Sequence, residues 1–306
     1  MPQKPKYAAR RGGAGYRAAQ RRGSNNTVWW MFGAVALAIL VLVVVRLLVP
    51  SGGPGSSQDG KPVAADVLMN LTSVPLSAFD SVGIGPAKGS GKVITPAGGT
   101  TTLWKDSTGK PVVMYVGAEY CPYCAATRWA LVTGLSRFGT FKGLEYMTSS
   151  PTDVYPDTPT FTFVHATYSS PYVDFQPVEE QGEIIGQPLQ SLNAQQSAYR
   201  AKYEAAPYFP GAVPGQYDYP FVDVANRYLW EGAFYSPSVL AGQLWPAISQ
   251  AVHAGKAPVA QSVLGGANVL SAAICAVDGG RPAPVCQSSG VKAAATTLPK
   301  AQGAGA

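Results

Sequence analysis

The sequence predicts an α/β domain carried behind a single transmembrane helix. Two segments predict the domain. A short β-branched run, residues 112–116, passes directly into a helical pattern, and residues 219–232 read as strand, turn and strand with a helix to follow. Residues 28–49 are apolar apart from Arg46 and predict the transmembrane helix, because about 20 residues span a bilayer core. From residue 61 to about residue 286 the composition is globular, and roughly 225 residues suffice for one compact domain.

The N-terminal end predicts a membrane topology. Residues 1–27 hold seven basic and no acidic side chains among Gly and Ala, which is typical of a disordered basic arm. The positive-inside rule keeps this arm in the cytoplasm and places the domain outside the cell membrane. We therefore expect a single-pass protein that meets the lipid bilayer through residues 28–49. A cleaved secretory signal is the alternative, although its apolar region is usually about 7–15 residues. Residues 50–61 read as a Gly/Ser/Pro linker.

The charge follows the same division. The whole chain carries +6, yet residues 1–46 hold eight basic and no acidic groups, so the 15 basic and 17 acidic residues beyond them give −2. The pI of about 9.1 therefore belongs to the anchor region. We expect no nucleic-acid partner for the domain. A nucleic-acid-binding role for the basic arm stays open, but membrane orientation explains its charge more simply.

A Cys-x-x-Cys motif stands where the first strand passes into its helix. The first N–H groups of a helix lack intrahelical partners, and the helix dipole adds positive charge, so a thiolate there is stabilised. Cys121 takes the cap position and is the expected attacking thiolate, and Pro122 suits the first helical position. Cys124 lies one turn further along, close enough to form a disulfide and to resolve a mixed disulfide. The helix ends at Gly139.

Two other uses of this cysteine pair need weighing. A zinc site would need a second pair or histidines at ligand spacing, but Cys275 and Cys286 are eleven positions apart and His165 and His253 stand alone. The pair could also be an inert structural disulfide. Redox chemistry remains the preferred interpretation, and it requires neither a metal nor another cofactor.

The motif and its context resemble a known superfamily. The apolar strand followed by Ala-Glu-Tyr-Cys-Pro-Tyr-Cys, residues 118–124, resembles the active-site strand and helix of thioredoxin-like proteins, and glutaredoxins share the Cys-Pro-Tyr-Cys spelling. With Arg-Phe-Gly-Thr-Phe at residues 137–141, the longer run is similar to an uncharacterised family of membrane-anchored, DsbA-like proteins, a domain of unknown function. The resemblance covers about residues 60–287. It implies a thioredoxin-like fold, with a central mixed sheet flanked by helices and a helical insertion, and it brings no established substrate.

The remaining elements are predicted in chain order. We expect a short helix at 63–71, a strand at 144–147, a hairpin of 161–164 with 172–175, a helix at 192–205 capped by Ser191, a helix from Ser236-Pro237 to about 252, and a helix at 257–276. An insertion spans about residues 150–218 within a domain of residues 62–287. Its aromatic side chains either form a peptide-binding cap over Cys121 or simply pack the insertion onto the core.

The resemblance also implies a cis-proline facing the cysteine pair. Pro220 heads the strand–turn–strand segment and fits that role, so that Tyr219 would present its backbone to an extended peptide. Pro159 is the rival, since it heads another strand and lies nearer Cys121 in sequence. We assign substrate contact to Tyr120, Tyr219 and Pro220.

The C-terminal cysteines suggest a second pair. In an oxidising compartment, an even cysteine count favours a disulfide between Cys275 and Cys286. We expect a structural clip, with a relay that exchanges with Cys124 as the alternative. Residues 288–306 are rich in Ala and Gly and read as a disordered tail.

Together these observations predict a membrane-anchored, extracytoplasmic thiol–disulfide oxidoreductase. Its expected partners are exported cysteine-containing proteins and a redox partner in the membrane. Glu119, Pro122 and Tyr123 are candidates for tuning the thiolate, with a merely solvated Glu119 as the alternative. The competing class is a non-catalytic binding or scaffold module whose disulfides are structural. The motif leaves open whether the protein oxidises, reduces or isomerises, because reduction potentials differ by well over about 100 mV at the same spacing.

Overall fold

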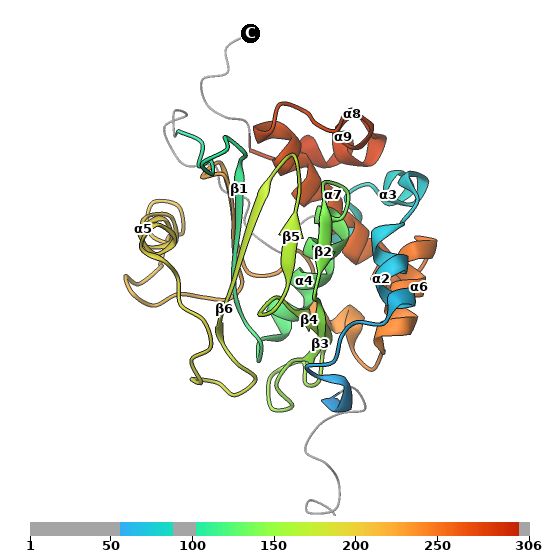
Figure 1. The fold of residues 1–306 in the computed structure, drawn as a ribbon, viewed down its shortest axis with the longest axis horizontal. Helices are drawn as coiled ribbons and strands as arrows, with labels where there is room; N and C mark the ends of the chain where they lie inside the picture. Colours follow the sequence, from blue (N-terminus) through green and yellow to red (C-terminus); the bar gives the residue numbers. More distant parts are fainter. Residues whose placement is uncertain (1–55, 88–101, 300–306) are drawn as a thin grey trace, which may run out of the picture. The chain divides into compact units, whose positions relative to one another are not determined.

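The computed structural model describes residues 56–87 and 102–299 (Figure 1). These residues belong to the compact unit that spans residues 52–306. The predicted basic arm, residues 1–27, the predicted transmembrane segment, residues 28–49, and the first part of the predicted linker lie outside the described residues.

A four-stranded sheet forms the centre of the fold. Its strand order is β6 (Asp174–Gln181), β1 (Val112–Ala118), β7 (Phe221–Val224) and β8 (Tyr228–Glu231). β1 runs parallel to β6 and antiparallel to β7, and β7 runs antiparallel to β8. The sheet is therefore mixed, and helices flank it on both faces, which confirms the predicted α/β class with a central mixed sheet.

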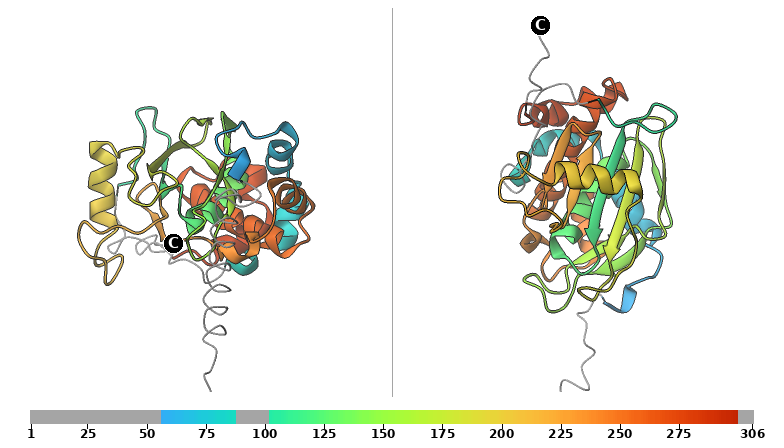
Figure 2. Two further views of the ribbon diagram at one scale, coloured as in Figure 1. Left: turned by 90° about the horizontal axis from the view of Figure 1, so that it is seen from below. Right: turned by 90° about the vertical axis from the view of Figure 1, so that its left-hand side faces the viewer.

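Every residue of β1 is buried, because both faces of the sheet are covered. Val113 and Tyr115 point into the larger core against α4 (Pro122–Leu135) and α7 (Pro258–Val277). Val112, Met114 and Val116 point into a second core with Tyr203 at the end of α5 (Ala194–Tyr203). α5 crosses the strands on this second face (Figure 2). Burial on two faces explains why the sequence of β1 is apolar without alternation.

α7 packs closely against α4. A Cβ added at Gly266 would lie 3.1 Å from the Cβ of Ala130, so the two helices approach as near as small residues allow. Among the described residues α7 is the one helix long and apolar enough to cross a membrane, but 83% of its apolar window is buried inside the domain. This burial is the behaviour of a core helix. In the sequence, α7 comes well after the predicted membrane segment at 28–49, which lies outside the described residues.

The smaller elements surround this core. They are η1 (Ser56–Gln58), α2 (Ala65–Thr72), α3 (Leu76–Val82), η2 (Gly85–Ala87), β2 (Thr140–Lys142), β3 (Glu145–Thr148), β4 (Pro159–Thr162), β5 (Thr167–Ser169), η3 (Pro237–Leu240), α6 (Trp245–Ala254), α8 (Ala283–Cys286) and α9 (Ser289–Ala295). The predicted elements at 63–71, 144–147, 192–205, 219–232 and 257–276 all correspond to observed helices or strands within a few residues.

The predicted hairpin of 161–164 with 172–175 is wrong. β4 pairs with β3, β5 pairs with β2, and β6 pairs in parallel with β1. β6 reads Asp-Phe-Gln-Pro-Val-Glu-Glu-Gln, which shows little apolar patterning, so its place beside β1 was not visible in the sequence. The predicted insertion at 150–218 is corrected accordingly. The first part of this segment supplies β4 and β6, and β6 belongs to the central sheet. Only the part after β6, which contains α5, is an insertion relative to that sheet.

Two helices differ from expectation. The helix predicted from Ser236 to about 252 is split into η3 and α6, because Gly242 adopts a left-handed φ of 69° between them. α5 is capped by Asn193 rather than Ser191. The Asn193 side chain accepts from the N–H of Gln196, and the Gln196 side chain accepts in return from the N–H of Asn193.

The predicted disordered tail, residues 288–306, is contradicted over its described part. α9 packs against α7 and α3, with Val291 and Ala294 buried in the core. Alanine favours helix, and Gly290 permits the close approach, since a Cβ there would lie 2.6 Å from the carbonyl oxygen of Phe79. Packing against α7 and α3 therefore gives a regular structure to a segment whose composition alone predicts disorder.

The disulfide between Cys275 and Cys286 is present and joins α7 to α8. We expect replacement of both cysteines by Ser to lower the unfolding free energy of the full chain by about 3 kcal/mol, the value for a loop this short. The melting temperature should fall with it. Thiol–disulfide exchange per folded molecule should stay nearly unchanged, because Cys275 and Cys286 pack against the larger core and not against the cluster that contains Cys121. Thermal unfolding beside an exchange assay on one preparation measures both. Lost activity at an unchanged melting temperature would show that the second pair is a relay.

Candidate functional site

The Cys-x-x-Cys pair lies at the junction of β1 and α4. β1 ends at Ala118, and Cys121 is the N-cap of α4 with an extended backbone, φ −82° and ψ 121°. Its Sγ accepts a hydrogen bond from the N–H of Cys124 at 3.3 Å, and Pro122 occupies the first helical position. Both thiols are free. Cys121 is thus held against the donors of a helix N-terminus, as the sequence predicted from the spacing.

The two cysteines differ in acidity. The thiol of Cys124 donates toward Cys121 and lowers the pKa of Cys121, and the Cys124 N–H, the Arg128 charge and the Tyr123 N–H lower it further against the opposing effect of burial. Complete burial raises the pKa of Cys124 well above the usual value. Cys121 is therefore the more acidic thiol of the pair, and Cys124 is the less acidic one.

β7 brings Tyr219 and Pro220 to this pair. Phe221 pairs with Val116, so the residues just before β7 lie beside the end of β1. The Tyr219–Pro220 bond is cis, and the carbonyl oxygen of Tyr219 lies 3.8 Å from the Sγ of Cys121. Pro159 instead heads β4, where its carbonyl oxygen accepts from the indole of Trp129. Of the two candidate prolines, Pro220 is therefore the one that faces the cysteines.

The other predicted residues gather around the same thiol. The ring of Tyr120 stands edge-on to that of Tyr219, with centroids 6.5 Å apart, and Tyr123 is exposed beside Tyr155. Glu119 is half-buried, and its carboxylate accepts from the hydroxyl of Thr162 at 2.6 Å. Burial raises the pKa of Glu119. The alternative of a merely solvated Glu119 does not hold.

A buried ion pair beneath the site was missed by the sequence reasoning. Arg128, one turn beyond Cys124 on α4, donates to both carboxylate oxygens of Glu179 on β6, at 2.8 and 2.6 Å, and also to the carbonyl oxygen of Ala118. Neither side chain of the pair is exposed. The pair fastens α4 and β6 to the last residue of β1. A charged residue in an otherwise apolar helix was the available signal.

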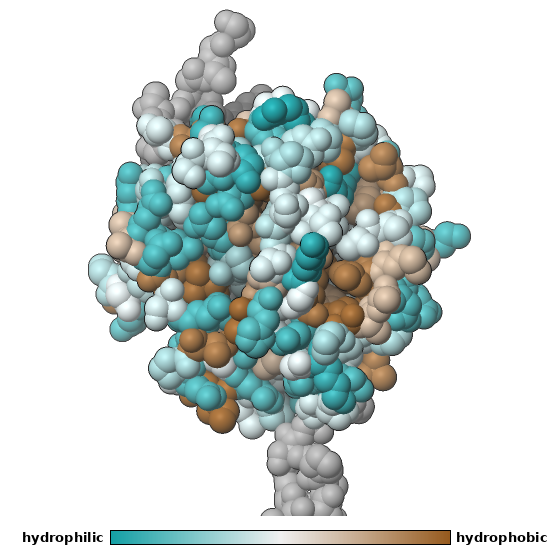
Figure 3. Space-filling model, in the orientation of Figure 1, coloured by the Kyte–Doolittle hydropathy of each residue, from teal (hydrophilic) through white to brown (hydrophobic). Residues whose placement is uncertain are grey.

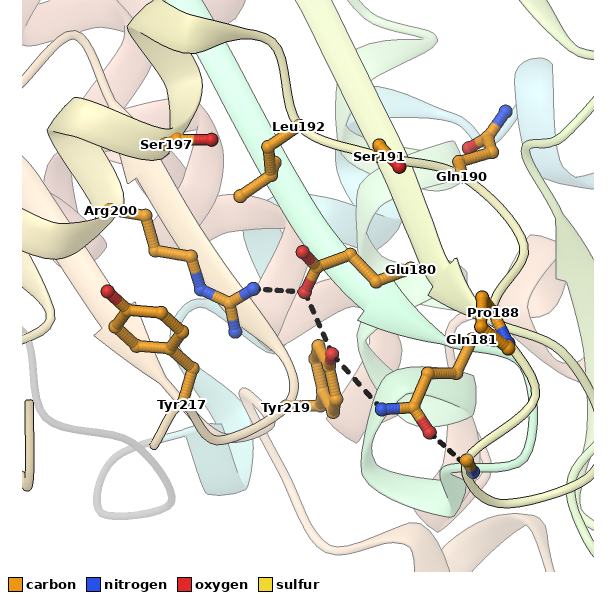
Figure 4. A pocket seen from close by; sticks show the side chains of 11 residues that line it. Glu180, Gln181, Pro188, Gln190, Ser191, Leu192, Ser197, Arg200, Tyr217 and Tyr219 are labelled. Atoms are coloured by element: carbon orange, nitrogen blue, oxygen red, sulfur yellow. Dashed lines mark hydrogen bonds and ion pairs between the residues drawn. The ribbon is translucent and has the colours of Figure 1, made fainter. Parts of the chain in front are cut away.

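A second network joins α5 to the residues that precede Pro220. The guanidinium of Arg200 binds Glu180 and Glu204 and donates to the carbonyl oxygen of Asp218 at 3.2 Å. Glu180 in turn accepts from the hydroxyl of Tyr219 at 2.8 Å, and these groups line one wall of a cleft (Figure 4). The insertion therefore holds Tyr219 in place, and no pattern in the sequence linked these distant residues.

The aromatic side chains of the insertion mostly pack. Tyr203 and Phe209 are buried with β1 and β7 in the second core, while Tyr217 and Tyr219 line the cleft beside Cys121. The packing alternative therefore holds for Tyr203 and Phe209, and a peptide-binding role for the rings beside Cys121 stays a prediction. Among the described residues, no group of three or more His, Cys, Asp or Glu side chains is arranged to hold a metal ion.

Comparison with known proteins identifies the family. No curated protein and no solved structure matches the chain. A family profile described as a domain of unknown function, DUF929, matches residues 105–276, which include β1, α4, the whole central sheet, α5 and most of α7. The match covers more than half of the chain and contains both cysteines of the Cys-x-x-Cys motif. The chain therefore belongs to the DUF929 family.

Proposed function

We propose that this protein is a thiol–disulfide oxidoreductase that acts on protein cysteines through Cys121 and Cys124. The observation that carries the proposal is the difference between the two thiols. One caps a helix and has a lowered pKa, and the other is buried one turn away with a raised pKa. Such a pair can attack a partner and then resolve the mixed disulfide.

A thioredoxin-like fold is part of this proposal. Three features support it: a central strand that leads into a Cys-x-x-Cys helix, a parallel neighbour on one side of that strand, and an antiparallel hairpin on the other side headed by Pro220 next to the cysteines. Helices cover both faces of the sheet. The Tyr219 carbonyl at Cys121 offers an extended substrate a backbone hydrogen-bond acceptor.

The exchange balances as follows. In the reducing direction, the Cys121 thiolate attacks a substrate disulfide, so a Cys121–substrate bond forms and one substrate thiolate leaves and takes up a proton. Cys124 then loses its proton and attacks the sulfur of Cys121, which closes the Cys121–Cys124 disulfide and releases the second substrate thiolate. Two electrons pass to the substrate. In the oxidising direction the same steps run in reverse. A redox partner in the membrane restores the pair after each cycle.

The test is a catalysed exchange reaction. Purified full chain is added in trace amounts to a peptide with two cysteines and a glutathione redox buffer, and the change of the peptide between dithiol and disulfide is followed. We expect multiple turnovers with the natural sequence and none with Cys121→Ser. A peptide reaction that proceeds at the uncatalysed rate with folded protein present would refute the proposal.

One observation favours the competing class. Cys121 is only 6% exposed, which is low for a nucleophile and fits a domain that binds partners without exchange. In that case the paired cysteines would serve only to brace the β1–α4 junction. The two classes differ in one measurable property, the reactivity of Cys121 at mildly acidic pH.

We also propose that residues 28–49 anchor the protein with its domain outside the membrane. The excess of basic residues in the arm before this segment supports that orientation. Protease added to intact cells should then digest the domain and spare residues 1–27, with permeabilised cells as the control. Protection of residues 61–287 by an intact membrane would reverse the assignment.

A further inference from the structure

A cleft leads from Cys121 toward α5. Two adjoining hollows of about 510 and 480 Å³ form it. Cys121 and Tyr120 line one end. Arg200 lines the other end, which Figure 4 shows. The wall common to both hollows consists of Glu180, Gln181, Tyr217 and Tyr219. The cleft thus passes the Tyr219 carbonyl that faces the thiol.

Exposed apolar side chains stand on the loops around the thiol. The backbone of Tyr120 hydrogen-bonds to Ser150 on one side and to Gly182 on the other, so the loops that follow β3 and β6 both adjoin the site. Val154 projects from the first of these loops, and Ile184 and Ile185 project from the second, with Ile184 68% exposed. Apolar surface shows at the lower left of Figure 3, where the loop after β6 lies. Exposed apolar side chains on the loops beside a cleft are typical of a contact surface.

Acidic side chains accompany the apolar ones. Glu180 and Asp218 line the cleft, Asp153 and Glu183 lie on the two adjoining loops, and Glu119 precedes the motif. Two of them, Asp153 and Asp218, act electrostatically on Tyr120, the residue that precedes Cys121. The pKa of Tyr120 is raised, mainly by burial. The negative charges of Cys121, Asp153 and Asp218 raise this pKa further.

Among the described residues that line the cleft, the only cation is already paired. Arg200 is engaged by Glu180 and Glu204, so one positive charge is shared between two carboxylates. The charge that the cleft offers a ligand is therefore negative. An approaching segment with negative charge would be repelled, and one with positive charge would be attracted.

We infer that this surface selects polypeptide segments whose reacting cysteine is flanked by cationic and apolar side chains. The inference rests on the proposed exchange function and names its substrate class. With the substrate sulfur at Cys121, the segment runs along Tyr219, its apolar side chains contact the loops that carry Val154 and Ile184, and its Lys or Arg side chains meet Asp218 and Glu180. A cation beside the substrate cysteine also favours the substrate thiolate that leaves in the reducing direction.

The test measures how fast Cys121 captures matched peptides. The full-length Cys124→Ser variant in nonionic detergent reacts with three peptides that carry a pyridyl disulfide: Lys-Leu-Cys-Leu-Lys, Glu-Leu-Cys-Leu-Glu and Lys-Ser-Cys-Ser-Lys. The Cys121–peptide bond forms, the bond to the pyridyl sulfur breaks, and released thiopyridone is read by absorbance. Each rate is divided by the rate of the same peptide with mercaptoethanol, which removes differences in intrinsic reactivity.

We expect the Lys-Leu peptide to react about tenfold faster than the Glu-Leu peptide and several-fold faster than the Lys-Ser peptide. The ratio of Lys-Leu to Glu-Leu should shrink in about 1 M salt, where the Debye length falls to about 3 Å. In Asp218→Asn it should fall by about threefold. Asp66→Asn is the matched control, because Asp66 is an exposed carboxylate on α2, outside the cleft, and should leave the ratio unchanged.

The possible failures are distinguishable. Equal normalised rates for the three peptides, with normal reaction toward the small reagent dipyridyl disulfide, would overturn the substrate inference and leave the exchange function intact. Failure of Cys121 to react even with dipyridyl disulfide would remove the proposed function and this inference with it. A peptide adduct that is quickly replaced by a disulfide-linked dimer, as the Cys121 thiolate of a second copy displaces the peptide thiol, would show that the surface receives a second copy of the chain instead.

Discussion

The Cys124→Ser variant is expected to accumulate mixed disulfides with partner proteins, seen as higher bands on a non-reducing gel that disappear on reduction. Cys121 would still attack, since it remains the cap of α4 with an N–H donor at residue 124. The resolving thiol, however, is gone, so the bond to the partner persists. The Cys121→Ser variant should trap nothing, because the buried Cys124 with its raised pKa is unreactive.

A matched pair of variants sharpens this experiment. Replacement of Cys275 and Cys286 by Ser in the Cys124→Ser background should leave trapping unchanged, because their disulfide lies on α7 and α8, away from the cleft. Equal trapping by Cys121→Ser and Cys124→Ser, or trapping by neither, would contradict the roles assigned to the two thiols.

The Arg128→Met variant is expected to lose about 3–5 kcal/mol of unfolding free energy. Met fills much of the same volume, but it leaves Glu179 buried with no cation and removes the hydrogen bond to Ala118. Denaturant unfolding of the full chain in detergent measures the loss. The alkylation pKa of Cys121 should also rise, because the Arg128 charge helps to lower it.

The double variant Arg128→Met with Glu179→Gln is the control for this prediction. It removes both charges and should recover part of the stability, because an unpaired buried charge costs more than the loss of the pair itself. If the unfolding free energy of Arg128→Met alone lies within about 1 kcal/mol of that of the natural sequence, the buried pair contributes little, and water or a rearranged side chain compensates for its loss.

Local signals in the sequence were sufficient for the motif and its flanking elements. The β-branched run of β1, the cysteine spacing at the start of α4 and the turn at Ala225 and Asn226 each act over a few residues, and each recurs in the structure near its predicted place. Ala225 and Asn226 both adopt positive φ, at 56° and 58°, as a two-residue turn between antiparallel strands requires. Backbone and capping preferences of this kind are properties of short segments.

The missed features depend on residues far apart in the chain. β6 has no apolar alternation and joins the sheet by parallel pairing across some 60 residues, so its pattern resembles a loop. The ion pair of Arg128 with Glu179 spans α4 and β6, and that of Arg200 with Glu180 spans α5 and β6. Each partner looks like an ordinary surface charge until the strand is placed. The helix α9 was missed because its stability comes from packing on α7 and α3 rather than from its composition.

The measurement that tests the central claim most directly is the pH dependence of Cys121 alkylation by iodoacetamide, with the modified residue identified by mass spectrometry. Because the hydrogen bond from the Cys124 thiol lowers the pKa of Cys121, the alkylation rate of the folded protein should reach half its maximum at a lower pH than that of the urea-unfolded chain. Cys124→Ser, which keeps a hydroxyl donor, should retain most of this shift, and Cys124→Ala should lose more of it. A half-maximum in the folded protein at the same pH as in the urea-unfolded chain, or at a higher pH, would contradict thiol–disulfide exchange at this site.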